Sequence, residues 1–177
     1  PNPRAFNYVF DFLKRHKLLD EKYDQFAKLL RANGAMFERE FEFANDLSLT
    51  LMTLEKWGEA RWVLDTALAA YKKFGKPNPI LTANFGLNLI QLKVHTNRPY
   101  SAKDRRELER FAEIDSPYPK LGAHILMENW PEAEKQLCRC LDLGPSGRAG
   151  INRWPIIELL KPHISNPKTL NKLRRAK

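Results

Sequence analysis

Hydrophobic residues recur at helical spacing along almost the whole chain of 177 residues. Apolar side chains that are three, four and seven positions apart lie on one face of a helix, whereas an alternating pattern is typical of a strand. The spacing predicts an all-α protein without strands. The expected elements are a helical hairpin over about 5–33 and helices over about 36–54, 58–74, 79–95, 102–114, 119–128 and 131–143.

Residues that favour turns mark the expected ends of several helices. Asn33-Gly34 tolerates the left-handed conformation that often ends a helix. Ser101 is expected to cap the N-terminus of the helix that follows it. Pro117 and Pro119 are expected to break that helix.

The last part of the chain has a different pattern. Gly147, Gly150 and Pro155 predict an irregular linker, yet the apolar residues around them are too frequent for a free linker. We expect a short helix over about 153–161 that covers the open end of the preceding helices. A basic helix over about 165–177 is expected to follow.

One pattern of seven positions occurs twice. It begins with a tryptophan, followed by a small residue three positions later and a large apolar residue four positions after that. This pattern is typical of a helix that packs closely against a partner helix. Trp57 and Trp130 begin the two copies, about two periods apart for helical hairpins of roughly 34 residues. The following positions are Ala60, Leu64, Ala67 and Leu68 in the first copy, and Ala133, Leu137, Cys140 and Leu141 in the second.

These residues and their neighbours resemble the tetratricopeptide repeat. In a unit over about 41–74, Leu47 and Leu51 stand at apolar positions of the family's first helix. A second unit, over about 115–145, also matches the family, whereas residues 96–118 form either a regular repeat or an insertion. The matching residues of the second unit are Leu121, Gly122, Trp130, Ala133, Leu137, Leu141 and Pro145.

The resemblance implies a fold and a general role. The fold is a right-handed superhelical array of about four helix-turn-helix hairpins over residues 1–145. A basic C-terminal capping segment over residues 146–177 packs on or trails this array. The family is a general binding scaffold, so the resemblance does not specify the partner.

The first hairpin has a second likeness. Its residues resemble a pentatricopeptide unit, the RNA-reading relative of the same helical hairpin. The likeness covers one unit only, and the two families share their geometry. It depends on Phe6-Asn7, Phe12-Leu13-Lys14, Leu19-Asp20-Glu21, Phe26 and Asn33-Gly34.

A peptide-binding array would line its concave side with the first helix of each hairpin. Asn84 resembles the asparagine with which carboxylate-clamping members hold a ligand backbone, and Lys120 could meet an acidic terminus as a point charge. Asn45 stands where that clamp has a lysine, so the clamp is incomplete. Alternatively, Asn84 and Asn88 are solvated helix residues. The candidate ligand-binding residues are Asn45, Leu49, Met52, Thr53, Asn84, Asn88, Gln91 and Lys120.

The net charge of +9 is concentrated at the C-terminus. Residues 1–145 carry 22 Lys and Arg against 20 Asp and Glu, whereas residues 146–177 carry 8 against 1. Such a segment suits a peripheral contact with RNA, DNA or an acidic surface, and it is also typical of a solvated terminus. The candidate nucleic-acid contacts are Arg148, Arg153, Lys168, Lys172, Arg174, Arg175 and Lys177.

No motif predicts catalysis, a cofactor or a metal site. The glycine-rich residues 144–150 lack the Gly-Lys-Ser/Thr of a phosphate-binding loop, and the four histidines lie far apart. Cys138 and Cys140 point about 200° apart on a helix, so they suit neither a disulfide nor a metal. Apolar stretches fall far short of the roughly 20 residues that span a membrane. We expect a soluble protein of a reducing compartment such as the cytoplasm.

The sequence therefore predicts a non-catalytic scaffold or adaptor for protein–protein recognition. It could be the sensing or assembly region of a larger multidomain protein. The alternative is an RNA- or DNA-binding component of a ribonucleoprotein that uses the basic C-terminal segment. Self-association through an exposed end of the array is a third possibility.

Overall fold

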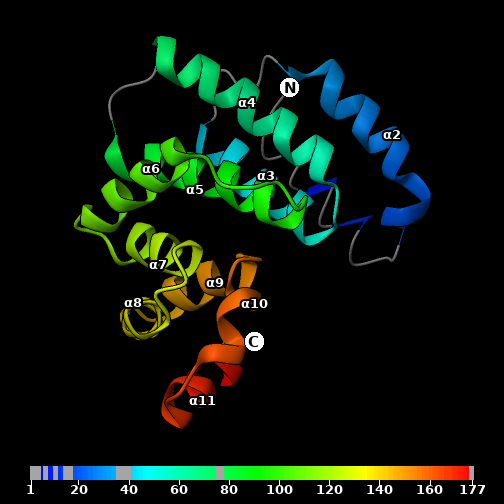
Figure 1. The fold of residues 1–177 in the computed structure, drawn as a ribbon. Coiled ribbons are helices and arrows are strands. Elements are labelled where there is room, and N and C mark those ends of the chain that lie inside the picture. The colour runs from blue at the N-terminus through cyan, green and yellow to red at the C-terminus, as the bar shows by residue number, and fades with distance from the viewer. Residues whose placement is uncertain are drawn as a thin grey trace.

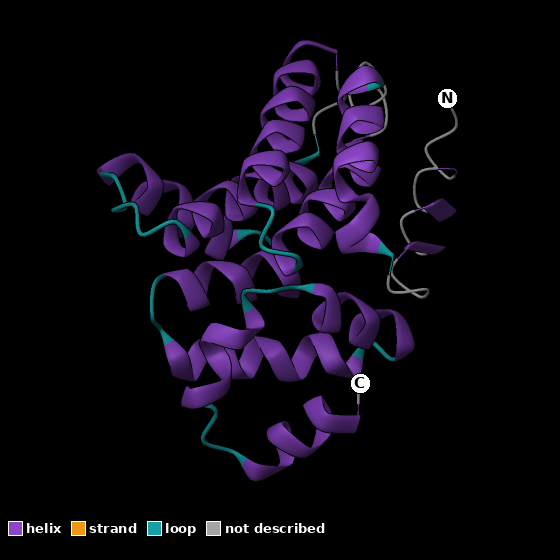
Figure 2. Ribbon diagram, turned by 90° about the vertical axis from the view of Figure 1, so that its right-hand side faces the viewer, coloured by secondary structure: helices purple, strands orange, loops and turns teal. Residues whose placement is uncertain are grey.

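Helices make up most of the part of the chain that the structure, a computed structural model, describes. It describes residues 18–34, 41–74 and 78–175 together with Ala5, Tyr8, Val9, Phe12 and Leu13, except for the side chains of residues 19, 20, 74, 146, 149, 152, 153 and 175. No strand occurs within these ranges, as Figure 2 shows, and the prediction of an all-α protein is confirmed there. Most of the predicted first helix, with Phe6 and Asn7 of the pentatricopeptide-like pattern, lies outside the described residues.

The helices follow one another from one end of the molecule to the other (Figure 1). α2 and α4 lie at one end, α3, α5 and α6 in the middle, and α7 to α11 towards the other end. The bounds of α4, α6 and α8 differ from the predicted ones by one residue, and those of α5 agree. The elements are α2 (Leu19–Ala32), α3 (Phe41–Thr53), α4 (Trp57–Phe74), α5 (Pro79–His95), α6 (Ala102–Glu113), α7 (Pro117–Leu126), α8 (Trp130–Asp142), α9 (Pro145–Arg153), α10 (Ile157–Leu160), the 3-10 helix η2 (Lys161–His163) and α11 (Pro167–Arg175).

α3, α5 and α7 end in the same backbone motif. Glu55, Asn97 and Glu128 follow these helices with φ of 58°, 52° and 58°. In each case two N–H groups bond back into the last turn, as in a Schellman cap; for α3 the N–H of Lys56 donates to the carbonyl of Leu51 at 2.9 Å. The same turn thus leads from α3 into α4, from α5 towards α6, and from α7 into α8.

The residues predicted to mark helix ends do so. α2 ends at Ala32, and Asn33, which caps it, has φ of −115°, outside the left-handed region that was expected to be possible there. Pro117 and Pro119 lie in the first turn of α7, so they begin a helix as well as separate it from α6. Proline suits this position because the first N–H groups of a helix have no partner within the helix. Ser101 caps α6 as predicted, and its hydroxyl accepts the N–H of Asp104 at 3.1 Å.

The predicted linker after residue 144 is a helix. α9 contains both Gly147 and Gly150, and it packs against α8. A Cβ atom on Gly147 would lie 2.0 Å from the carbonyl oxygen of Cys140 in α8. The glycine is therefore needed for close approach of two helices, not for an irregular backbone.

The two copies of the seven-position pattern are buried alike at three corresponding positions, whereas at the fourth Leu68 is half-buried and Leu141 is 2% exposed. The hydrophobic core forms two clusters, one mainly from α2 to α5 and the other from α5 to α11. α5 joins them because Phe85 belongs to the first cluster and Leu87 to the second. Six pattern residues have no exposed surface at all, namely Ala60, Leu64, Ala67, Ala133, Leu137 and Cys140.

The tryptophans that begin α4 and α8 each stack on a histidine. The rings of Trp57 and His95 have centroids 4.8 Å apart and planes 11° apart. The rings of Trp130 and His163 have centroids 4.0 Å apart and planes 1° apart. The start of α4 thus contacts the end of α5, and the start of α8 contacts η2 in the corresponding way.

The C-terminal helix α11 is attached to α8 by a buried carboxylate. Glu134 accepts hydrogen bonds from the backbone N–H and hydroxyl of Ser165 at 3.0 and 2.8 Å, and from the N–H of Asn166 at 2.9 Å. Burial raises the pKa of Glu134, but these hydrogen bonds lower it by more, so its pKa lies below the usual range. Thr169 and Leu173 are buried and lie on the face of α11 that packs against the rest of the protein.

Candidate ligand-binding groove

An open hollow lies where α3 and α5 meet α7 and α9. Its volume is about 140 Å³. Apolar and aromatic side chains form much of its wall, and Trp154 reaches it from the end of α9. We call it the apolar hollow; it is lined by Asn45, Leu49, Ile80, Asn84, Asn88, Tyr118, Gly150 and Trp154.

A second hollow adjoins the first at the N-terminal ends of α3 and α5. Its volume is about 250 Å³, and it shares Asn45, Ile80 and Asn84 with the apolar hollow. Within the described residues, Glu42 and Asp46 are the only charged side chains that line either hollow, and both are exposed. We call it the acidic hollow, and the two together the groove. It is lined by Glu42, Asn45, Asp46, Asn78, Ile80, Leu81 and Asn84.

Two buried polar atoms at the apolar hollow have no hydrogen-bond partner among the described residues. Asn88 is 2% exposed; its Nδ2 donates to Oδ1 of Asn45 at 2.9 Å, but its own Oδ1 is unpaired. Trp154 is 8% exposed, and its indole Nε1 is also unpaired. Buried polar groups in proteins are almost always paired. Both atoms have almost no exposed surface of their own, so a ligand with the complementary groups reaches them only when the side chains around the hollow shift.

The structure brings together four of the eight predicted ligand-binding residues. Asn45, Leu49, Asn84 and Asn88 line the apolar hollow. The alternative that Asn88 is a solvated helix residue is wrong, because its side chain is buried and bonded to Asn45.

The other four predicted residues line neither hollow. Met52 and Gln91 are buried, so they present almost no surface to a ligand. Thr53 is exposed, and its hydroxyl donates to the carbonyl of Leu49 at 3.0 Å. Lys120 lies half-buried on α7. Residues one turn apart on a helix share a face, and the residues between them lie on other faces. For this reason, some of the predicted residues line the apolar hollow and their neighbours in the sequence do not.

Sequence reasoning missed several residues of the groove. Trp154 is one of the apolar residues of the C-terminal segment, and nothing in the sequence joins it to Asn88. Tyr118 reaches the hollow while its hydroxyl donates to the carbonyl of Gly147 at 3.1 Å. Ile80 gave a usable signal, because it is a large apolar residue outside the core stripe of its helix; it is 41% exposed.

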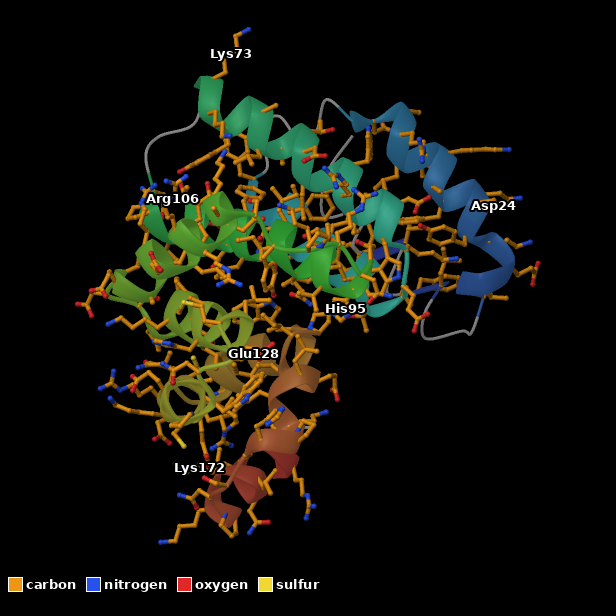
Figure 3. All side chains as sticks on the ribbon, viewed as in Figure 1. Asp24, Lys73, His95, Arg106, Glu128 and Lys172 are labelled. Atoms are coloured by element: carbon orange, nitrogen blue, oxygen red, sulfur yellow. The ribbon has the colours of Figure 1, made fainter. Side chains whose placement is uncertain are left out.

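The basic residues of the C-terminal segment lie on α9 and α11. Arg148, Lys168, Lys172 and Arg174 are exposed. Lys172 pairs with Asp142 of α8 at 2.6 Å, and lies at the end of the molecule opposite Lys73 (Figure 3). The side chains of the other three candidates, Arg153, Arg175 and Lys177, lie outside the described residues.

The described part of the chain shows no metal-binding group and no membrane-spanning helix. No three His, Cys, Asp or Glu side chains in it are placed to hold a metal ion. None of its helices combines the length and the apolar character that a membrane span needs. Cys138 and Cys140 form no disulfide, and burial raises the pKa of the Cys140 thiol to about 12.

Comparisons with protein-family models, with curated proteins and with solved structures give no match. The groove itself is therefore the feature from which a function can be inferred. Its distinctive features are the two unpaired buried atoms of Asn88 and Trp154 and the two carboxylates of Glu42 and Asp46.

Proposed function

We propose that the chain is a non-catalytic protein-binding module that holds a peptide segment of a partner protein in the groove. The observation that carries this proposal is that Asn88, with an unpaired buried acceptor, and Trp154, with an unpaired buried donor, line the same hollow. Every residue of a peptide other than proline has one backbone N–H and one backbone C=O. When the lining side chains shift on binding, the peptide N–H donates to Oδ1 of Asn88, and its C=O accepts the indole N–H of Trp154.

The size of the apolar hollow suits one side chain. A dry protein cavity of about 150 Å³ holds a molecule the size of benzene, and the apolar hollow measures about 140 Å³. Leu49, Ile80 and Trp154 give it an apolar wall. The side chain of the bound residue fills the hollow while its backbone bonds at the rim. The acidic hollow continues the groove, as an elongated ligand requires.

The proposal includes a tetratricopeptide-like array of hairpins. Three features support it: the shared cap that ends α3, α5 and α7, the complete burial of three corresponding positions in the two seven-position patterns, and the two matching Trp–His stacks. In this array α3–α4, α5–α6 and α7–α8 are successive hairpins. η2 contacts Trp130 as the end of α5 contacts Trp57, so the C-terminal segment takes the place of a further unit.

Selection of peptides on the full chain tests the proposal. Heptapeptides recovered from an unbiased displayed library are titrated into the 15N-labelled protein. The indole signal of Trp154 and the side-chain amide signal of Asn88 are expected to shift with one common Kd. Trp154→Phe removes the donor and is expected to raise Kd by about tenfold, as for one hydrogen bond.

Trp130→Phe is the matched control, because Trp130 lies outside the lining of both hollows. Its Kd should equal that of the wild type. Peptides that bind both variants equally and leave the Trp154 signal unmoved would overturn the proposal.

Nucleic-acid binding is the second candidate. The observation in its favour is the exposure of Arg148, Lys168 and Arg174 on helices that pack against the rest of the molecule. Fluorescence anisotropy with a mixed-sequence single-stranded RNA tests it at two salt concentrations. Each phosphate contact contributes about −0.7 to the slope of log K against log salt. Lys168→Glu with Arg174→Glu should abolish such binding, and weak, salt-independent binding would exclude it.

A further inference from the structure

Two aromatic rings form fixed walls of the apolar hollow. A Cβ atom on Gly122 would lie 2.6 Å from Cη2 of Trp154, so the indole lies directly against the backbone of α7. A Cβ atom on Gly150 would lie 3.0 Å from the Tyr118 hydroxyl, which also donates to the carbonyl of Gly147 at 3.1 Å. Tyr118 is therefore held against α9 as Trp154 is held against α7.

The remaining wall of the apolar hollow is adaptable. Leu49, Ile80 and Asn84 also line it, and each of them retains exposed surface. Side chains at the surface change rotamer readily. These three side chains therefore provide the movement that a ligand needs to reach Asn88 and Trp154, while the two rings stay in place.

The lining of the apolar hollow is neutral. Every described residue that lines it has an uncharged side chain, and the two that belong to the core interior, Asn88 and Trp154, are at most 8% exposed. Burying an isolated charge costs far more than burying a neutral group. An aspartate, glutamate, lysine or arginine in this hollow would leave its charge without a partner there, so the side chain that fills it is neutral.

Size and wall chemistry together indicate an aromatic side chain. The volume of about 140 Å³ is close to that of a dry cavity, about 150 Å³, that holds benzene. Aromatic rings attract one another in edge-to-face or offset arrangements, in addition to the gain from the area that they bury. Burial of a leucine contributes about as much as burial of a phenylalanine, but leucine lacks this attraction. The walls formed by Tyr118 and Trp154 therefore favour a phenyl ring over an aliphatic side chain.

Resting on the proposed function, we propose that the groove selects a partner segment that is anchored by a phenylalanine, and that Tyr118 and Trp154 determine this selection. The phenyl ring contacts both aromatic walls. The backbone of the same residue bonds to Asn88 and to the indole N–H of Trp154.

Synthetic peptides test this preference on the full chain. The probes are acetylated and amidated pentapeptides with the sequence Gln-Ala-Phe-Ala-Gln, and matched peptides carry Leu or Ala in place of Phe. None of them is charged, so differences between them do not depend on salt. Binding is followed through the indole NMR signal of Trp154, which detects weak complexes.

The Phe peptide is expected to bind about fivefold more tightly than the Leu peptide, as for one favourable aromatic pair. The Ala peptide, which leaves the hollow unfilled, should bind more weakly than both. Tyr118→Leu removes one aromatic wall and should reduce the difference between Phe and Leu to about twofold.

Two variants serve as matched controls for Tyr118→Leu. Tyr118→Phe also loses the hydroxyl but keeps the ring, so the preference for Phe should stay about fivefold. Tyr100 is another half-buried tyrosine at the same core cluster, and it lines neither hollow. Tyr100→Leu should leave the preference unchanged, because a general loss of stability does not distinguish Phe from Leu.

The failures of the two proposals are distinguishable. If Phe and Leu peptides shift the Trp154 signal with equal Kd, the aromatic preference is wrong and the peptide groove stands. This comparison uses the wild type alone, so it decides even if a Tyr118 variant does not fold. An undiminished preference in folded Tyr118→Leu, or library-derived peptides that bind at Trp154 without an aromatic residue, would also overturn it. If the Phe peptide does not move the Trp154 signal, the preference fails, and the library-derived peptides alone decide the proposed function.

Discussion

Replacing Glu134 with glutamine should release α11 from α8. The carboxylate accepts three hydrogen bonds from Ser165 and Asn166, just before α11 begins at Pro167. Glutamine has nearly the same shape but one oxygen fewer and no charge. Its NH₂ group would face an N–H donor, so at least one of the three bonds is lost.

The structure allows the size of this effect to be worked out. A hydrogen bond to a charged group contributes about 1.5–3 kcal/mol, and a neutral one about 0.5–1.5 kcal/mol. Losing one charged bond should by itself cost about 2 kcal/mol, which is about 30-fold in the opening equilibrium of α11, and weakening of the other two bonds adds to this minimum. α11 is short and packs against α8, so we expect this helix to open locally while the core stays folded.

Hydrogen exchange of the α11 backbone amides at pH 7 measures this opening. Exchange in Glu134→Gln should be about 30-fold faster than in the wild type, with little change in α3 to α5. Glu132→Gln is the matched control on the same helix, because the Glu132 carboxylate bonds to Lys135 and Gln136 of α8 itself. Exchange of α11 within about threefold of the wild type in Glu134→Gln would refute the reasoning.

The pH dependence provides an independent check. The pKa of Glu134 in the folded protein lies below its ordinary value, so the unfolded or detached state binds the proton more readily. The carboxylate's stabilisation is therefore complete above the ordinary glutamate pKa of about 4.3, and is lost as pH falls through the lower folded value. Acid should release α11 in the wild type, and Glu134→Gln should lack this transition.

Three further predictions concern the rest of the fold. Asp104→Asn should lower the thermal midpoint of unfolding by roughly 5 °C, because the Asp104 carboxylate accepts hydrogen bonds from Lys93 and from the backbone N–H of Ser101. Burial raises the pKa of Asp104, but these hydrogen bonds lower it by more, so the charged form stabilises the fold. An unchanged midpoint would contradict this. Gly147→Ala should lower the free energy of unfolding in urea by about 1–3 kcal/mol, because the new Cβ atom would clash with the carbonyl of Cys140. Gly58→Ala should raise it slightly, because a Cβ atom there meets no neighbouring residue within 4 Å and alanine favours the helix. Equal effects of the two would refute the clash. Burial lowers the pKa of His95, so the unfolded state binds its proton more readily and stability should fall as pH drops below about 6.5. His95→Phe keeps an aromatic ring there and should make the fall in urea-unfolding stability between pH 7 and 5 shallower; an equal slope would count against the argument.

Local sequence signals were sufficient for most of the helices. The bounds of α5 agree with prediction, because Pro79 opens it and its apolar spacing continues to the last turn. The two tryptophan-led patterns also predicted burial correctly, since a small residue at Ala67 or Cys140 is useful only where another helix comes close. Asn45, Leu49, Asn84 and Asn88 were among the eight residues selected for the concave side of a tetratricopeptide-like array, and the structure gathers these four at one hollow.

Local signals failed where a contact joins distant segments. Gly147 and Gly150 were taken as signs of a linker, but the space that α8 and Tyr118 leave to α9 explains both glycines. The left-handed turns lie at Glu55, Asn97 and Glu128. Only asparagine among these residue types favours that conformation. The turns at the two glutamates therefore follow from the packing of successive helices and not from the local sequence.

The sequence by itself determined the helices, their buried faces and the basic character of the C-terminal segment, because backbone hydrogen bonding and apolar periodicity act over a few residues. Only the tertiary structure decided that α9 folds back onto α3 and carries Trp154 to Asn88. The partners of a side chain in a site depend on how whole helices pack, and packing sums many weak contacts between residues far apart in the chain. The groove and its charge belong to that second level.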